Sequence, residues 1–161
     1  MAKEQANLES DNKINLTITT PRGVKFIEKA DMVIMRCIDG DLGVLPGHAP
    51  VSTELGDGIL RIFNNGVEKK LALFGGAAEI EDTTVNIFST IAQHPDEIDL
   101  ERAERDRKEV EATILEESEE HQIRRLQVLL HRSLLRIEVS TQLENTGYPE
   151  DGEEEENIDV Q

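Results

Sequence analysis

Arginines in the C-terminal half of the chain have the types and spacing best suited to chemistry. Residues 96–146 contain neither glycine nor proline. If this stretch folds as two antiparallel helices that reverse near residue 119, position 102 lies opposite 136, and 105 lies opposite 133. One end of this hairpin, the end nearest the preceding domain, would then gather Arg102, Arg105, Arg132 and Arg136. Because guanidinium groups suit phosphate oxygens as well as carboxylates, the cluster predicts an anion site.

A second interpretation of the same arginines remains open. Acidic side chains are abundant in these helices and can pair with the arginines as exposed salt bridges, each contributing little free energy. The acids concerned are Asp99, Glu101, Asp106 and Glu138.

Other reactive side chains do not form a recognisable centre. The four histidines, at positions 48, 94, 121 and 131, have no metal-ligand spacing with one another or with Cys37. No local motif suggests a Ser-His-Asp or Cys-His arrangement. Cys37 lies in an apolar run, where we expect it to pack in the core. The sequence therefore predicts no metal site and no catalytic residue.

Charge and composition restrict the partners of this chain. With 17 basic and 34 acidic residues, the 161-residue chain has a formal net charge of −17. Binding nucleic acid requires a basic face, so we expect no nucleic-acid partner. No segment approaches the roughly 18–20 apolar residues of a membrane span, so we expect no direct membrane insertion. The polar first residues lack a signal peptide, and we expect the chain to remain on the cytoplasmic side.

Residues 14–93 have the pattern of an all-β sandwich or barrel. Apolar residues alternate with polar ones over 14–19, and apolar or β-branched runs follow at 24–30 and 32–38. Asn65-Gly66 is a strong hairpin signal, so 59–63 should pair with 67–74. Gly75-Gly76 indicates a bulge or a close backbone approach. We expect the last strand at 85–87.

The stretch over residues 40–51 carries three glycines and two prolines among apolar side chains. The backbone must turn repeatedly while these side chains reach a core, which predicts an ordered loop. His48 lies between two small neighbours, so we expect its ring to be exposed at the loop tip. A buried structural histidine is the alternative.

After Pro95 the composition changes to good helix formers. Acids crowd around Ser118, where we expect the reversal, with the serine as a cap. The second helix has an apolar stripe that should be buried: Ile123, Leu126, Leu130, Leu134 and Ile137. The first helix offers only a thin stripe, so the hairpin should dock onto another surface.

These patterns divide the chain into four parts. We expect a disordered arm over 1–13, an all-β sandwich domain over 14–93 and an α-helical hairpin of two antiparallel helices over 94–146. The remaining residues, 147–161, should form a disordered acidic tail because seven of them are acidic and none is basic.

The run over residues 40–51 closely resembles the signature loop of the epsilon subunit of F-type rotary ATP synthases, with Gly-Asp-Leu-Gly followed by Pro-Gly-His-Ala-Pro. This resemblance implies a non-catalytic central-stalk subunit of a proton- or sodium-translocating enzyme. It would bind the gamma subunit and contact the ring of c subunits through Asp41 and His48. The hairpin would extend into the catalytic alpha/beta head and suppress ATP hydrolysis. The implied location is peripheral, on the cytoplasmic face of a bacterial plasma membrane.

Residues 98–103 are also similar to a motif tied to ATP binding in some bacterial epsilon subunits. The resemblance implies no required cofactor but a regulatory ATP, bound by Asp99, Arg102, Ala103, Arg132 and Arg136. The chain departs from the motif pattern at Gln93 and Glu109, where a glutamate and an arginine are expected. The alternative function is a free-standing ATP-sensing regulatory protein that signals to an unrelated partner.

Overall fold

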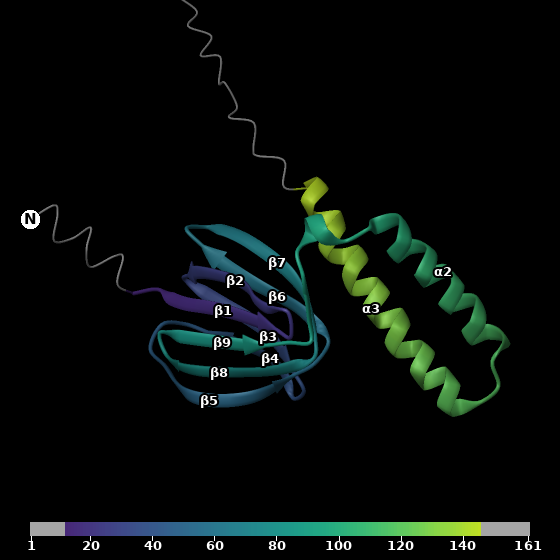
Figure 1. The fold of residues 1–161 in the computed structure, drawn as a ribbon, viewed down its shortest axis with the longest axis horizontal. Helices are drawn as coiled ribbons and strands as arrows, with labels where there is room; N and C mark the ends of the chain where they lie inside the picture. The colour runs from purple at the N-terminus through teal and green to yellow at the C-terminus, as the bar shows by residue number, and fades with distance from the viewer. Residues whose placement is uncertain (1–11, 146–161) are drawn as a thin grey trace, which may run out of the picture.

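The computed structural model describes residues 12–145, which form a β-sandwich followed by a helical hairpin (Figure 1). The expected fold class is thereby confirmed. The predicted tail and most of the predicted arm lie outside the described residues. Of the arm, Asn12 and Lys13 are described, and the Lys13 ammonium nitrogen lies 2.8 Å from an Asp31 carboxylate oxygen.

Within the described residues 12–145, ten strands follow one another before the first helix. Their bounds are β1 Ile14–Thr20, β2 Gly23–Ala30, β3 Met32–Cys37, β4 Gly40–Val44, β5 His48–Leu55, β6 Gly58–Asn64, β7 Val67–Phe74, β8 Gly76–Asp82, β9 Thr84–Phe88 and β10 Ile91–Gln93. They pair in the order β10-β7-β6-β3-β5-β8-β9-β1-β2, and β4 pairs with β3. The β1–β9 pair is parallel.

The sandwich core consists of aliphatic side chains that alternate along the strands. In β1, for example, Ile14, Leu16 and Ile18 are fully buried, whereas their neighbours are not. Cys37 is buried in the same cluster, as its apolar surroundings predicted. The expected pairing of 59–63 with 67–74 is confirmed by the β6–β7 register.

The prediction of an ordered loop over 40–51 was wrong. Most of this stretch forms β4 and the first half of β5, and only residues 45–47 lie between the two strands. Gly40 and Gly47 adopt positive φ angles of 132° and 84°, which suits the turns at these ends. Pro50, which cannot donate a backbone hydrogen bond, falls at a register shift between β5 and β8.

The end of the sandwich also differs from expectation. A short strand, β10, follows β9 and pairs with β7, so 85–87 is not the last strand. The chain between β9 and β10 passes close to Gly76, where an added Cβ atom would lie 2.0 Å from the Phe88 carbonyl oxygen. This confirms the close backbone approach that Gly75-Gly76 predicted.

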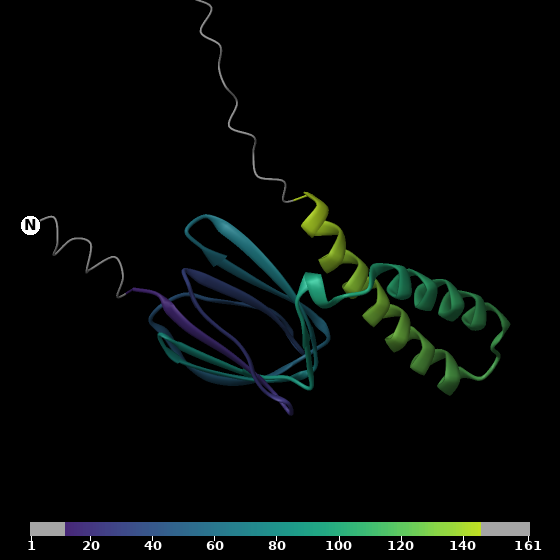
Figure 2. The ribbon, with the colours of Figure 1, turned by 45° about the horizontal axis from the view of Figure 1, so that its top comes forward.

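The hairpin begins after a 3₁₀ turn, η1 (Pro95–Glu97), and comprises α2 (Leu100–Glu116) and α3 (Glu120–Asn145). The two helices lie side by side in both ribbon views (Figures 1 and 2). Asp99 caps α2, because its Oδ1 accepts from the Arg102 backbone N–H at 2.9 Å. The reversal near 118 is confirmed, but Ser118 does not act as expected. Backbone N–H groups in this turn donate to the Glu117 carboxylate.

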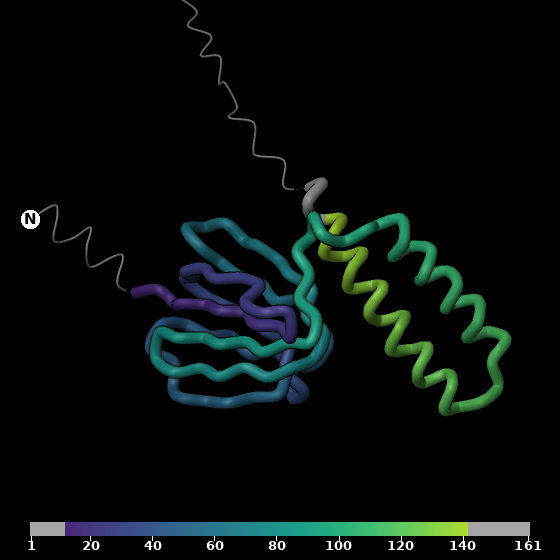
Figure 3. Tube along the Cα trace, viewed as in Figure 1, coloured from purple at the N-terminus to yellow at the C-terminus, as the bar shows by residue number. Residues whose placement is uncertain are grey.

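The burial pattern of α3 corrects the predicted apolar stripe. Leu134 is 44% exposed, whereas its neighbour Leu135 is buried together with Val139. These two side chains pack on Ala72 and Phe74 of β7. The other stripe residues are only half-buried, because one helix has to face both the sheet and α2. The tube view shows the single crossing from the sheet to the hairpin (Figure 3). No helix within residues 12–145 is long and apolar enough to span a membrane.

Candidate functional site at the junction of sandwich and hairpin

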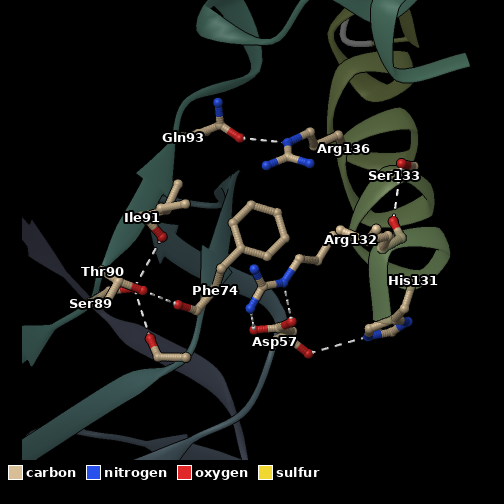
Figure 4. A network of polar contacts seen from close by, with 12 residues as sticks. Asp57, Phe74, Ser89, Thr90, Ile91, Gln93, His131, Arg132, Ser133 and Arg136 are labelled. Carbon is tan, nitrogen blue, oxygen red and sulfur yellow. Dashed lines mark hydrogen bonds and ion pairs between the residues drawn. The ribbon is translucent and has the colours of Figure 1, made fainter. Parts of the chain in front are cut away.

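The candidate site lies where α3 docks on the ends of three sheet segments (Figure 4). The β5–β6 turn supplies Asp57, β7 ends in Phe74, and β10 ends in Gln93. Helix α3 supplies Arg132 and Arg136, which share one helix face because they are four residues apart. The connection to β10 is fixed by the buried Ser89, whose hydroxyl oxygen lies 2.8 Å from the Gly75 carbonyl oxygen and 3.0 Å from the Ile91 carbonyl oxygen and can donate its one proton to either.

Phe74 is the apolar centre of this junction. Its ring is fully buried. The guanidinium carbons of Arg132 and Arg136 lie 5.4 Å and 4.6 Å from the ring centroid. Both distances are within the range of a favourable cation–π contact. One ring therefore holds two positive charges close together.

The two guanidiniums have different partners. Arg132 Nε donates to Asp57 Oδ2 at 2.6 Å, and Arg132 Nη2 lies 3.4 Å from Asp57 Oδ1. Arg136 Nε donates instead to the neutral amide oxygen of Gln93 at 2.8 Å. Among residues 12–141, whose side chains the structure describes, Arg136 forms no ion pair. Arg132 is thus neutralised locally, and Arg136 is not.

Burial lowers the pKa of the Arg136 guanidinium from its ordinary value, and the charge of Arg132 lowers this pKa further. Asp106 acts in the opposite direction but with a smaller effect. Arginine nevertheless stays protonated in proteins. A partly desolvated cation with only a neutral partner favours the approach of an anion.

A pocket of about 250 Å³ opens beside Arg136. Its lining consists of Gln93, Glu97, Ile98, Asp99, Arg102, Ala103, Asp106 and Arg136. Four of the five residues predicted for nucleotide binding therefore share one cavity: Asp99, Arg102, Ala103 and Arg136. The fifth, Arg132, is not part of the lining and points toward Asp57 (Figure 4).

The four predicted arginines do not all converge. Arg105 is exposed and does not line the pocket. Arg102 Nε lies 4.0 Å from Asp106 Oδ2, which agrees with the salt-bridge interpretation for this pair alone. Sequence reasoning missed Asp57, because Asp57-Gly58 indicated only a turn. It noted Gln93 as a departure from a motif, without a partner.

The structure does not bring Asp41 and His48 together. Asp41 is exposed beside the β3–β4 turn, and its carboxylate lies 3.1 Å from Arg36 Nη1. His48 begins β5 opposite Asp82, whereas Leu55, at the other end of β5, pairs with Cys37. The His48 ring is only half-buried, and its Nδ1 lies 2.7 Å from the Ala49 carbonyl oxygen. It lies at the start of a strand, not at the tip of a loop.

Comparison with known proteins finds relatives that cover most of the chain. Residues 13–95 match the family described as the beta-sandwich domain of the ATP synthase delta/epsilon chain. The ATP synthase epsilon chain of Desulforamulus reducens is 34% identical over 125 residues, which cover 78% of this chain and 95% of that relative. The corresponding chain of Bacillus velezensis is 33% identical over 127 residues, covering 79% and 96%.

A solved structure gives a similar result. A chain in the Euglena gracilis mitochondrial ATP synthase, a structure of OSCP, F1 and c-ring, superposes with a TM-score of 0.60 and 25% sequence identity. The match covers 83% of this chain and 81% of that chain. Since these alignments are longer than the matched sandwich, the similarity continues into the hairpin.

Proposed function

The chain belongs to the family of ATP synthase epsilon chains, and from this membership we propose that it couples the catalytic head to the c-ring as a subunit of the central stalk. As an epsilon chain it is a non-catalytic subunit of that complex. The observation that carries the proposal is the match of the sandwich domain together with relatives aligned over nearly their whole length.

The proposed partners are the gamma subunit and the c-ring, with the alpha/beta head reached through the hairpin. Asp41 and His48 are the proposed c-ring contacts. Asp41 is exposed in β4 and His48 is half-buried at the start of β5, and both lie within the β4–β5 segment that resembles the family's signature loop. The enzyme would translocate protons or sodium ions at a bacterial plasma membrane, with this subunit held peripherally on the cytoplasmic face.

The hairpin is the proposed regulatory element, which would suppress ATP hydrolysis by leaving the sandwich for the catalytic head. Its apolar contact with the sheet is small, consisting mainly of Leu135 and Val139 on β7. Apolar side chains remain exposed elsewhere on the hairpin, with Leu115 87% exposed and Leu129 51% exposed. A weak docking contact and an uncovered apolar surface both support a second docking position.

Regulatory ATP is the proposed ligand of the pocket beside Arg136. Arg102 and Arg136 would bind phosphate oxygens, and the Asp99 cap and the small Ala103 side chain would shape the cavity. Because Gln93 and Glu109 differ from the motif, we expect an affinity in the millimolar range. No catalytic step is assigned to this nucleotide.

The test is purification of the native complex. The chain, tagged at its C-terminus, would be captured from detergent-solubilised membranes, and the co-purifying chains would be identified by mass spectrometry. We expect gamma, c, alpha and beta subunits. Recovery of the chain alone from the soluble fraction, with ATP bound, would contradict the rotor assignment and favour a free-standing ATP-sensing regulatory protein.

A further inference from the structure

Asp57 stands out because it is a residue of the sheet that neutralises an arginine of the hairpin. Among residues 12–141 it is the one carboxylate paired with Arg132 or Arg136. Its side chain is 16% exposed and that of Arg132 is 35% exposed, so the carboxylate is largely removed from water and the guanidinium partly so. A charge-assisted contact of this kind, with two N–H groups directed at one carboxylate, is among the stronger polar interactions in proteins.

The turn that carries Asp57 is built tightly. An added Cβ atom on Gly58 would lie 2.4 Å from the Arg36 Cβ atom. The Gly56 backbone N–H donates to the Arg36 carbonyl oxygen at 3.0 Å. The carboxylate is therefore held by the rigid part of the molecule before the hairpin docks, and little conformational entropy is lost when it receives Arg132.

The charges at the junction would be unbalanced without this carboxylate. Arg132 and Arg136 share the Phe74 ring, and the remaining acceptor in the contact is the neutral Gln93 amide. The positive charge of Arg132 already contributes to the lowered pKa of Arg136. Two like charges held this close oppose docking of α3 unless an anion offsets one of them.

We propose that Asp57 is an internal counter-ion of Arg132 and holds the hairpin on the sandwich when no nucleotide is bound. Its carboxylate occupies the position beside Arg132 that a nucleotide phosphate would otherwise occupy. The second of these statements rests on the proposed binding of ATP at the adjacent pocket. Docking of the hairpin then does not require nucleotide. A nucleotide that uses both arginines must first displace the Asp57 carboxylate from Arg132.

Docking of the hairpin should therefore depend on nucleotide only when the negative charge of Asp57 has been removed. The test uses the full chain, the variant Asp57→Asn and the control Asp39→Asn. The control removes the same charge from the exposed β3–β4 turn, where Asp39 has no ion pair among the described residues. Amide hydrogen exchange of α3 is measured by mass spectrometry with and without millimolar ATP. Calorimetry on the unmodified chain measures ATP binding separately.

Without ATP, we expect the amides of residues 132–140 to exchange about tenfold faster in Asp57→Asn than in the unmodified chain, because a charged hydrogen bond is lost. The amides of β6 and β7 should keep their protection, which shows that the sandwich remains folded. Millimolar ATP should restore slow exchange in Asp57→Asn and should change the unmodified chain little. Asp39→Asn should behave like the unmodified chain.

The outcomes separate the two ideas. Unchanged exchange in Asp57→Asn, or equal acceleration in both variants, overturns the role of Asp57 as a counter-ion for docking. If calorimetry detects ATP but ATP fails to restore slow exchange in Asp57→Asn, the replacement of carboxylate by phosphate is overturned. If calorimetry detects no ATP while Asp57→Asn still undocks, the nucleotide function fails, and the docking role of Asp57 is supported.

Discussion

At the scale of single residues, Arg132 and Arg136 differ in environment although they are one helical turn apart. Arg132 has a carboxylate partner, and Arg136 has a neutral amide and faces a pocket. The two side chains therefore contribute differently. Arg132 mainly fixes the hairpin on the sheet, and Arg136 mainly makes the pocket positive.

Replacement of Arg132 tests this division. Arg132→Ala leaves the poorly exposed Asp57 carboxylate unpaired, so we expect docking of the hairpin to lose roughly 1.5–3 kcal/mol. Calorimetry should show ATP affinity reduced more than tenfold, because the pocket beside Arg136 lies between the hairpin and the sandwich and is lost when the hairpin undocks. Arg124→Ala is the control: its pair with Glu120 is fully on the surface and should contribute only about 0.3–0.5 kcal/mol. Equal effects of Arg132→Ala and Arg124→Ala on docking and on ATP affinity would show that the arginines form only a salt-bridge network.

Gly76 is a second residue at which a single substitution should change stability strongly. Gly76→Ala would place a Cβ atom 2.0 Å from the Phe88 carbonyl oxygen, at a φ of 122° that side chains rarely adopt. We expect a loss of roughly 2–4 kcal/mol in the free energy of unfolding measured with urea. Gly43→Ala has no atom within 4 Å of its added Cβ and should change stability by less than about 1 kcal/mol. A tolerant Gly76→Ala would show that β8 and β9 can separate here.

Half of the candidate pocket could be predicted from the sequence, because these residues belong to a motif and to the two helices of one hairpin. Asp99, Arg102 and Ala103 are neighbours in the chain, and the antiparallel pairing of the helices adds Arg136. Asp57 could not be predicted, since 75 residues separate it from Arg132 and only the docked hairpin brings them together. In the docked hairpin Arg132 pairs with Asp57, so it does not line the pocket, although its four-residue spacing from Arg136 had predicted that it would.

At the scale of secondary-structure elements, Lys13 joins three parts of the sandwich. Its ammonium group lies 2.8 Å from Asp31 Oδ1 and donates to Asn64 Oδ1 at 2.6 Å and Asn65 Oδ1 at 2.8 Å. Asp31 also accepts from the Asn65 backbone N–H at 2.7 Å. The start of β1 is thereby tied to the β2–β3 and β6–β7 turns.

This contact predicts a pH dependence of stability. The bond from Lys13 lowers the pKa of Asp31 below its ordinary value of 3.8, and the Asn65 backbone bond lowers it further. A depressed folded-state pKa gives stability that is present above 3.8 and is lost as pH falls through the folded value. We therefore expect the melting temperature of Asp31→Asn to be lower than that of the unmodified chain at pH 7. As the pH falls through this lowered folded-state pKa, the two melting temperatures should converge. A constant difference across this range would contradict the role of the ionised carboxylate.

Strands with strict alternation were predicted well, and those with irregular backbone were not. The alternation of apolar and polar residues identifies β1 from the sequence alone. In β4 and β5, glycine and proline hide the alternation, and pairing with β3 and β8 overrides the local turn preference. The predicted apolar stripe of α3 was wrong for a related reason. The sequence does not show which face of the helix packs on the sheet and which packs on α2.

At the scale of the whole molecule, the sandwich should be independent of the hairpin. A chain truncated after Gln93 keeps β1 to β10 but uncovers the Phe74 ring. We expect cooperative urea unfolding, a loss of roughly 1.5–3 kcal/mol and continued capture of gamma and c subunits. Truncation after Thr90 also removes β10 from β7 and should destabilise the domain further. Non-cooperative unfolding of the first truncated chain would place the domain boundary elsewhere.

The position of the docking contact along α3 makes the hairpin a lever. Leu135 and Val139 hold the helix near one end, and the α2–α3 turn lies far from the sandwich (Figure 1). Leu135 lies fifteen residues after Glu120, so the two are about 22 Å apart along the helix at a rise of 1.5 Å per residue. A rotation of about 10° at the contact would then displace the tip by roughly 4 Å over that arm. Side-chain rearrangements too small to disturb the sandwich are in this way magnified at the far end of the hairpin.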